Sequence, residues 1–370
     1  MADLGAEVVH VEDPGLGDPS RYMGPKKGEI PLWWKVAGRN KRSVTLNLRT
    51  SEGQDLARRL AARADVVITN FRVGTIDKWG LDWETLHALN PKLVMLQISG
   101  NGANTTDRDE PGFGKKGEAM SGVVFLTGFA DGPPVHTGFS HADTVTAVMG
   151  AFAISAALTR RHDPEFNGEW IDLALFETLF RLIEWQIPVY DHLGLLPTRA
   201  GNQLAIAPGA VVNTYLTADD EWLTVTSATA RSVQNIATLL GLPEEDYVTV
   251  DQQLAGREVL DDGLRVWISS RTAAECLEAM RAREVVAARI YSVRDILEDQ
   301  TYRERDDILT MADADLGSIR MPGVVPKLAN HAGEVWRTGP ALGEDNDLVY
   351  REFLDIDDAE YAALRAAGTI

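Results

Sequence analysis

Cysteine is nearly absent from this chain of 370 residues, which contains only Cys276. A single cysteine cannot form an intramolecular disulfide, and proteins without disulfides are typical of reducing compartments. The seven histidines are scattered, and although four residues separate His136 from His141, no pair of cysteines accompanies them to complete a metal site. The sequence therefore predicts a cytoplasmic protein without a structural metal ion.

Long apolar runs and an excess of positive charge are also missing. No uninterrupted apolar stretch reaches the roughly 18 residues that span a bilayer. Residues 1–13 lack the basic and apolar regions of a secretory signal. The net charge is −19, whereas nucleic acids and anionic membrane surfaces bind dense cationic faces. These absences predict a globular protein that binds neither nucleic acid nor membrane.

The common nucleotide-binding and hydrolase motifs are absent as well. The chain has no G-x-G-x-x-G after a strand, no G-x-x-x-x-G-K-[ST] and no H-E-x-x-H. Residues 138–142 read Gly-Phe-Ser-His-Ala, which lacks the second glycine of the G-x-S-x-G elbow. A serine hydrolase with Ser140 as its nucleophile stays open as an alternative with an incomplete motif.

The first half of the chain does contain an alternation of short apolar strands and helical segments. The expected strands are 8–12, 43–48, 66–69 and 93–99, and the expected helices are 50–64 and 82–90. Strands separated by helices of this size form βαβ units and a parallel sheet. The sequence therefore predicts the α/β class, with Thr50 or Ser51 opening the first of these helices.

The remainder of the chain predicts a second, smaller domain. Residues 143–162 form an expected helix that is apolar on nearly every side, as in helices buried at a domain or subunit interface. The sequence then changes to a β-hairpin followed by helices. We expect a large α/β domain over 1–204, a small α+β domain over 205–305 and a return to the large domain over 306–370.

Although the net charge of the chain is negative, one segment between Arg21 and Arg49 is basic. Its only acid is Glu29, and its eight basic residues are Arg21, Lys26, Lys27, Lys35, Arg39, Lys41, Arg42 and Arg49. Taken alone, such a segment is more typical of a solvated basic edge. The alternative is a site for a phosphate-bearing ligand, because arginine and lysine are the usual phosphate partners.

Asp143 stands at the expected N-terminus of the apolar helix. The plainer interpretation is an N-cap, which the position alone favours. The functional interpretation is a nucleophile, because the helix dipole favours an ionised carboxylate at this end. Such a carboxylate needs no partner base to attack an activated acyl carbon.

Six segments carry motifs that recur together and in the same order. They are 2–18 (ADLGAEVVHVEDPGLGD), 38–53 (GRNKRSVTLNLRTSEG), 70–94 (NFRVGTIDKWGLDWETLHALNPKLV), 128–161 (GFADGPPVHTGFSHADTVTAVMGAFAISAALTRR), 167–177 (NGEWIDLALFE) and 326–350 (PKLANHAGEVWRTGPALGEDNDLVY). In these segments the chain resembles the family III CoA-transferases, which include formyl-CoA transferase, carnitine CoA-transferase and α-methylacyl-CoA racemase. The resemblance covers essentially the whole chain.

The resemblance implies an intertwined homodimer, each subunit having a Rossmann-like large domain and a smaller domain. It also implies coenzyme A bound on the α/β domain. Leu46 and Leu48 would flank the adenine and Arg49 would lie near the phosphates, while Asn70, Arg72 and Lys78 match further CoA contacts. With this resemblance, the phosphate interpretation of the basic segment overtakes the solvated edge.

Asp143 matches the catalytic aspartate of the family. The implied activity transfers CoA from an acyl-CoA donor to a carboxylic acid, through an aspartyl anhydride and an aspartyl-CoA thioester. Residues that could contact the substrate are Phe113, Lys115, Lys116 and His141. Coenzyme A and the two acids are then the expected ligands, without a metal ion.

Departures from the family pattern bear on two alternatives. The racemase branch uses a histidine in a Gly-His-Asp motif, which reads Gly-Phe-Gly at 112–114 here, although His141 could substitute. The oxalate-using branch has a glycine-rich loop where residues 199–203 read Arg-Ala-Gly-Asn-Gln, so oxalate is not expected as a substrate. Racemase or isomerase chemistry stays open as a disfavoured alternative.

The beginning of the chain also departs from the family. Relatives carry about 25 residues before residue 2, which form the first strand and the start of the first helix of a dinucleotide-binding-like fold. Either the natural start lies upstream or the chain is a shortened form with an incomplete CoA pocket. The second possibility favours a third alternative, a non-catalytic acyl-CoA-binding relative.

Overall fold

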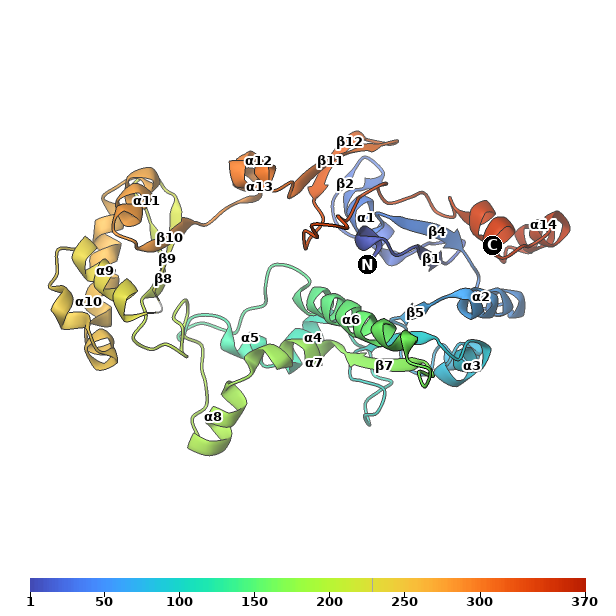
Figure 1. Cartoon of the computed structure of the whole chain (residues 1–370), viewed down its shortest axis with the longest axis horizontal. Helices are drawn as coiled ribbons and strands as arrows, with labels where there is room; N and C mark the ends of the chain where they lie inside the picture. Colours follow the sequence, from blue (N-terminus) through green and yellow to red (C-terminus); the bar gives the residue numbers. More distant parts are fainter. Residues whose placement is uncertain (228) are drawn as a thin grey trace. The chain divides into compact units, whose positions relative to one another are not determined.

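A computed structural model describes residues 1–227 and 229–370, which divide into two compact units (Figure 1). The first unit comprises Met1–Glu118, Ser140–Arg181 and Asp299–Ile370, and the second comprises Ala119–Phe139 and Leu182–Glu298. These bounds differ from the expected 1–204, 205–305 and 306–370, chiefly because residues 119–139 and 182–204 belong to the second unit.

Two parallel sheets lie in the first unit. One pairs β1 (Val8–Glu12) with β4 (Lys41–Thr45), and the other has the order β5 (Val66–Thr69), β6 (Val94–Ser99), β7 (Glu169–Ala174). These parallel ladders with helices between the strands confirm the predicted α/β class. Within the described residues, β1 and β5 each have a single hydrogen-bonded neighbour.

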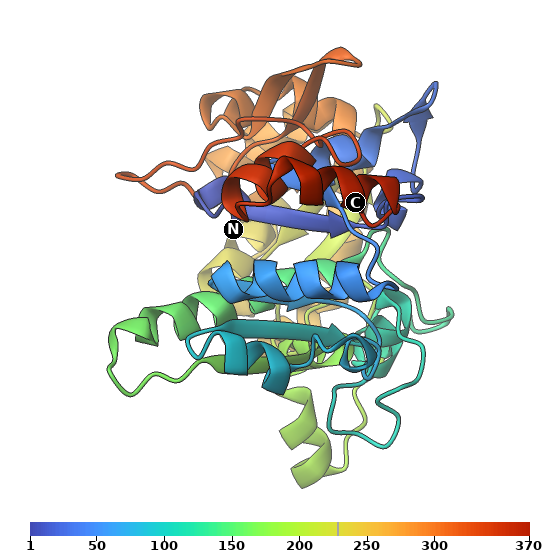
Figure 2. The same cartoon turned by 90° about the vertical axis from the view of Figure 1, so that its right-hand side faces the viewer.

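Helices α2 (Ser51–Arg63) and α3 (Trp83–Leu89) begin where the sequence predicts. The Thr50 hydroxyl accepts a hydrogen bond from the backbone N–H of Gly53, and Asp82 accepts one from Thr85. These side chains satisfy backbone donors that a helix start leaves unpaired. The two helices pack against each other and stand in front of the β5–β6–β7 strands in Figure 2.

Helix α6 (His141–Thr159) packs on β6 and β7 and carries Asp143. Ser140 is its N-cap, so Asp143 is the third residue of the helix and the N-cap interpretation of Asp143 is wrong. Gly150 allows the close approach to the sheet, because a Cβ atom there would come 2.7 Å from Leu96 Cδ2. The sheet core beneath the helix therefore fixes where the first turn of α6 lies.

The outer face of α6 is apolar and largely uncovered in the described chain. Val148 and Phe152 are 66% and 72% exposed. By length and composition alone, the stretch His141–His162 could cross a membrane, although core helices of soluble proteins pass the same test. The expectation that no uninterrupted apolar run reaches 18 residues still holds, because polar residues such as Asp143 and Thr146 interrupt this helix, which passes on its average hydropathy.

The remaining elements of the first unit surround these sheets. They are β2 (Lys26–Lys27), β3 (Ile30–Pro31), α1 (Leu32–Ala37), α4 (Gly114–Met120, whose last two residues belong to the second unit), α7 (Leu175–Phe180), α13 (Gln300–Glu304), β11 (Ile308–Asp313), β12 (Gly317–Pro322) and α14 (Asp358–Ala366). A π-helix, Asp347–Phe353, precedes α14. The C-terminal part of this unit thus consists of two strands followed by helical segments.

The second unit contains an antiparallel sheet of order β10-β9-β8 with helices around it. Its elements are α5 (Val123–Leu126), α8 (Gln186–Leu193), β8 (Val212–Leu216), β9 (Trp222–Thr226), α9 (Ala230–Leu239), α10 (Val250–Ser269), α11 (Ala273–Ala282), β10 (Val286–Arg289) and α12 (Val293–Glu298). The predicted β8–β9 hairpin is confirmed. Helix α10 is the largest element that sequence reasoning missed.

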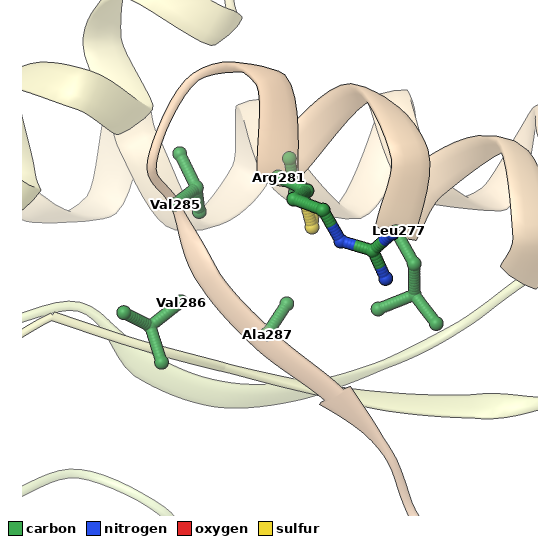
Figure 3. A pocket seen from close by; sticks show the side chains of 6 residues that line it. Leu277, Arg281, Val285, Val286 and Ala287 are labelled. Atoms are coloured by element: carbon green, nitrogen blue, oxygen red, sulfur yellow. The ribbon is translucent and has the colours of Figure 1, made fainter.

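A small hollow lies between α11 and the edge strand β10 in this unit (Figure 3). Leu277 and Met280 from the helix and Val286 and Ala287 from the strand line it, and Arg281 is the charged group of the lining. An apolar hollow with one guanidinium offers no nucleophile. The reactive group therefore lies outside this hollow.

Candidate active site

The carboxylate of Asp143 rests directly on the backbone of α4. A Cβ atom placed on Gly114 would come 2.2 Å from Asp143 Oδ2 and 2.8 Å from Cγ. Real Cβ atoms do not approach other atoms this closely, so glycine at 114 leaves the space that the carboxylate occupies. The glycine that replaces the polar residue of the racemase motif is therefore part of this site.

Two further glycines anchor α4 and the segment leading into it. A Cβ atom on Gly112 would come 2.4 Å from the Cα atom of Gly100, which directly follows β6. A Cβ atom on Gly117 would come 2.9 Å from the Cβ atom of Leu175 at the start of α7. The position of α4 against Asp143 thus follows from backbone contacts with the end of the sheet and with α7.

An ion pair between an exposed lysine and a buried glutamate accompanies Asp143. Lys115 Nζ donates to both carboxylate oxygens of Glu118, at 2.9 and 3.0 Å. The Glu118 side chain is 1% exposed, whereas the Lys115 side chain is 50% exposed. Sequence reasoning missed Glu118, although its i,i+3 spacing from Lys115 is the signal of a helical ion pair.

The surroundings of Asp143 raise the pKa of its carboxyl group above the ordinary value. Partial burial of the carboxylate is the main cause, and the negative charge of Glu118 acts in the same direction. A hydrogen bond from the backbone and the charge of Lys115 oppose the rise. A carboxylate that its surroundings stabilise less than water does is better suited to act as a nucleophile.

The other candidate substrate residues lie on the two helices that meet at Asp143. Phe113 directly precedes α4 and is 77% exposed. Lys116 lies on α4 and donates to Glu110 at 2.8 Å. His141 begins α6, two positions before Asp143, and residues two apart on a helix do not face each other. His141 is thus poorly oriented to replace the second acid/base group of a racemase.

The expected CoA contacts follow the carboxyl ends of β4 and β5. Asn70, Arg72 and Lys78 are exposed in the segment after β5. Ligands of parallel α/β sheets bind beyond the carboxyl ends of the strands. Because both β4 and β5 belong to the first unit, the two groups of expected contacts lie on the same unit as Asp143.

The three residues after β4 differ in their accessibility. Leu46 is 2% exposed and belongs to a core cluster with Val44, so contact with adenine would have to use its backbone. Leu48 is half-buried. Arg49 has an exposed side chain that pairs with Asp13 at 2.6 Å. Arg49 is therefore the member of this group with a charged side chain within reach of a phosphate.

Most of the basic segment is engaged in internal ion pairs. The pairs are Arg21–Glu12, Lys35–Asp313, Lys35–Asp315, Arg39–Asp3, Arg42–Glu7 and Arg49–Asp13, at 2.5 to 2.9 Å. All of these acids lie outside the segment, which is why the local sequence shows unbalanced charge. The segment is therefore mainly structural, and a phosphate contact is confined to fewer of its residues than the sequence predicts.

Among the described residues, no group of three or more His, Cys, Asp or Glu side chains is arranged to hold a metal ion. The side chains collected around Asp143 are instead a carboxylate, an acid–lysine pair and apolar surface. Comparison with family models gives the family of the chain. The model of CoA-transferase family III matches residues 1–346. The chain belongs to CoA-transferase family III.

Two named relatives show what related family III chains do. The succinyl-CoA–D-citramalate CoA-transferase of Chloroflexus aurantiacus is 39% identical, covering 100% of this chain and 92% of the relative. The succinyl-CoA–L-malate CoA-transferase beta subunit of the same organism is 35% identical, covering 100% and 93%. The chain is accordingly a CoA-transferase, and acyl-CoA is its substrate.

A solved structure shows the same fold. The crystal structure of a CAIB/BAIF family protein from Brucella suis is 30% identical and has a TM-score of 0.81. The similarity covers 95% of this chain and 92% of that one. The mixed α/β fold with parallel sheets is therefore that of a solved family member, and the resemblance drawn from the six sequence segments is confirmed.

Proposed function

We propose that Asp143 is the nucleophile through which this CoA-transferase moves CoA from an acyl-CoA donor to a carboxylic acid acceptor. The observation that carries the proposal is the Asp143 carboxylate itself, which lies against Gly114 at the start of a helix. The backbone N–H groups of the first turn favour an anion there. Burial and Glu118 limit that stabilisation, which keeps the carboxylate reactive.

The proposed reaction consists of four carbonyl substitutions that need no net proton transfer. The Asp143 carboxylate attacks the donor thioester carbonyl, forming the mixed anhydride and releasing CoA thiolate. The thiolate attacks the aspartyl carbonyl, which gives the aspartyl-CoA thioester and frees the donor acid. The acceptor carboxylate attacks this thioester and releases thiolate again. Attack of the thiolate on the new acyl carbonyl yields the product acyl-CoA and restores Asp143.

We further propose dicarboxylic acids as the substrates, with succinyl-CoA as the donor. The two named relatives use succinyl-CoA with citramalate or malate, both of which carry a second carboxylate. Lys115 and Lys116 follow the glycine that contacts Asp143, and of the two we assign Lys116 to the second carboxylate, because its partner Glu110 is exposed whereas Lys115 pairs with the buried Glu118. Lysine ammonium groups are common partners of such a carboxylate.

Intact-protein mass spectrometry tests both proposals. We expect incubation with succinyl-CoA to add a mass equal to CoA less water, and hydroxylamine to remove the addition. Acetyl-CoA serves as the control donor, because it lacks the second carboxylate. Protein that binds CoA but forms no adduct with any thioester would contradict the nucleophile, and equal labelling by both thioesters would contradict the dicarboxylate preference.

We propose that the enzyme is cytoplasmic. We also propose that CoA is bound by the large domain, through Leu46, Leu48, Arg49, Asn70, Arg72 and Lys78.

We propose that this large domain is Rossmann-like. The strand orders β4-β1 and β5-β6-β7 match the two sides of a doubly wound 3-2-1-4-5-6 sheet. In such a sheet, one further parallel strand lies between β1 and β5. Both β1 and β5 carry an exposed apolar residue, Val11 and Ile68.

Replacing Arg72 by alanine is expected to weaken CoA binding about tenfold, as for the loss of one charge-assisted hydrogen bond to phosphate. Arg72 is exposed after β5, where a phosphate would meet it without displacing a protein partner. Isothermal titration calorimetry with CoA measures the change. Arg257→Ala on the second unit is the matched control, and equal affinity of the two variants would contradict the assignment.

We propose that the enzyme is an intertwined homodimer in which a second copy covers the apolar face of α6. Exposed apolar patches of this kind mark interaction surfaces, and Phe152 is more exposed than Val148 on this face. The variant Phe152→Asp is expected to dissociate the dimer, as measured by light scattering coupled to size-exclusion chromatography. Phe71→Asp, also an exposed phenylalanine, is the control. A monomeric wild type would contradict the proposal.

A further inference from the structure

Lys115 stands next to the contact between Gly114 and Asp143, and yet the structure pairs it with Glu118. Its charge reaches Asp143 and opposes, without overcoming, the rise in the pKa of that carboxyl group that burial and Glu118 cause. Glu118, one turn further along α4, accepts hydrogen bonds from Lys115 at both carboxylate oxygens. No ion pair of Asp143 itself occurs in the described part of the chain.

The burial of Glu118 indicates why this arrangement is stable. A carboxylate that is 1% exposed cannot rely on water and must keep a cation or hydrogen-bond donors. Lys115 keeps half of its side chain in solvent, so it could reorient toward another anion if Glu118 did not hold it. Asp143 is an anion close to Lys115, since its carboxylate touches the neighbouring Gly114 and the charge of Lys115 acts on it.

We propose that Glu118 is a positioning residue that holds Lys115 away from Asp143, so that the nucleophile keeps an unpaired carboxylate. This inference rests on the proposed role of Asp143 as the nucleophile. A carboxylate locked to an ammonium group donates its electrons less readily, because ion pairing stabilises the ground state more than the dispersed charge of the transition state. Glu118 thus acts on the reaction through Lys115 without touching the substrate.

Other charged groups on the neighbouring elements have partners of their own or lie elsewhere on their helix. Lys116 on α4 pairs with Glu110, and Glu177 on α7 accepts a hydrogen bond from the backbone N–H of Ala174. His141 begins α6, and Arg181 follows α7. A backbone hydrogen bond also shifts the pKa of Asp143, but the charges that shift it are those of Glu118 and Lys115.

The test compares Glu118→Gln, Lys115→Met and the double variant. In the first variant Lys115 is released, and we expect the pKa of Asp143 to fall by about one or more, as for a carboxyl group that gains an opposite charge. In the second, Glu118 loses its cation, and the pKa of Asp143 is expected to rise. The double variant removes both charges, so its Asp143 is expected to return toward the wild-type value.

Carbodiimide labelling reads this pKa directly, because the reagent modifies the protonated carboxyl group. The labelling of the Asp143 peptide is followed by mass spectrometry as a function of pH. Lys92→Met is the matched control, since Lys92 is an exposed lysine that precedes β6 at the end opposite to the site. Its labelling midpoint is expected to equal that of the wild type.

The rate of adduct formation with succinyl-CoA provides the second readout. Glu118→Gln is expected to slow it at least about tenfold at neutral pH, and removal of Lys115 from that variant is expected to restore part of the rate. A purely structural role of the pair would not give rescue by the second substitution. Midpoints that coincide in all variants, or that shift in the same direction for both single variants, would overturn the proposal.

Failure of this inference and failure of the proposed function are distinguishable. Labelling by carbodiimide requires no turnover, so opposite midpoint shifts without a CoA adduct would refute the nucleophile while supporting the charge arrangement. A normal CoA adduct with unshifted labelling midpoints would support Asp143 as the nucleophile and refute the role of Glu118. If Glu118→Gln fails to fold by circular dichroism, Glu118→Asp replaces it, because the shorter side chain keeps the charge but holds Lys115 less firmly, and an unchanged pKa of Asp143 in that variant would overturn the proposal.

Discussion

The variant Asp143→Asn is expected to lose the covalent CoA adduct and at least about 10³-fold in turnover, in line with the removal of other enzymes' nucleophiles. Asparagine matches the size of aspartate, so it fits against Gly114 without moving α4 or the start of α6. Its amide lacks the anionic oxygen that attacks the thioester. Steady-state transfer from succinyl-CoA to a dicarboxylate, monitored by chromatography of the CoA esters, measures the loss.

Glu52→Gln provides the control for Asp143→Asn. Glu52 also lies in the first turn of a helix, α2, and its replacement removes the same charge. Its activity is expected to equal that of the wild type. An Asp143→Asn enzyme with more than a tenth of wild-type activity would show that the reaction does not proceed through this carboxylate.

The second large effect is expected from a single methyl group. Gly114→Ala places a Cβ atom where the Asp143 carboxylate lies, so the carboxylate or α4 must move. A displacement of about 1 Å in a reacting group costs on the order of 10²-fold in rate. We therefore expect a loss of this size in the rate of adduct formation, with CoA binding by calorimetry nearly unchanged.

Gly132→Ala is the matched control, because the nearest atom to a Cβ at that position is 3.6 Å away in ordinary contact. Thermal unfolding distinguishes a local displacement from loss of the fold, since the expected Gly114→Ala protein unfolds cooperatively. Full activity of Gly114→Ala would mean that the contact between α4 and Asp143 has no role in catalysis.

The sequence predicted the local structure well where local signals decide it. The apolar strands at 8–12 and 66–69 and the helix that Thr50 caps are formed as expected. Helix α10 was missed, although Thr249 and Gln252 form a capping box that marks its start. That helix has an apolar inner face and a mixed outer face, which made its period less evident than that of α2.

Contacts between distant parts of the chain could not be predicted from the sequence. The partners of Lys35 are Asp313 and Asp315, nearly 280 residues away, so the basic segment looked unbalanced. Asp143 itself could be proposed from its resemblance to the family motif. The contact of its carboxylate with Gly114, and the burial of Glu118 nearby, depend on how α4 meets α6 and could not be read from spacing.

Among the described residues, β1 and β5 each lack a neighbour on the side where we propose a further parallel strand, which has a consequence for handling the protein whenever that strand is not in place. A strand with one neighbour presents a row of backbone donors and acceptors that another polypeptide can pair with. Here both strands also carry an exposed apolar side chain, Val11 on one and Ile68 on the other. Self-association through added strands therefore competes with correct assembly during refolding, and yields of active enzyme should fall steeply as the protein concentration rises.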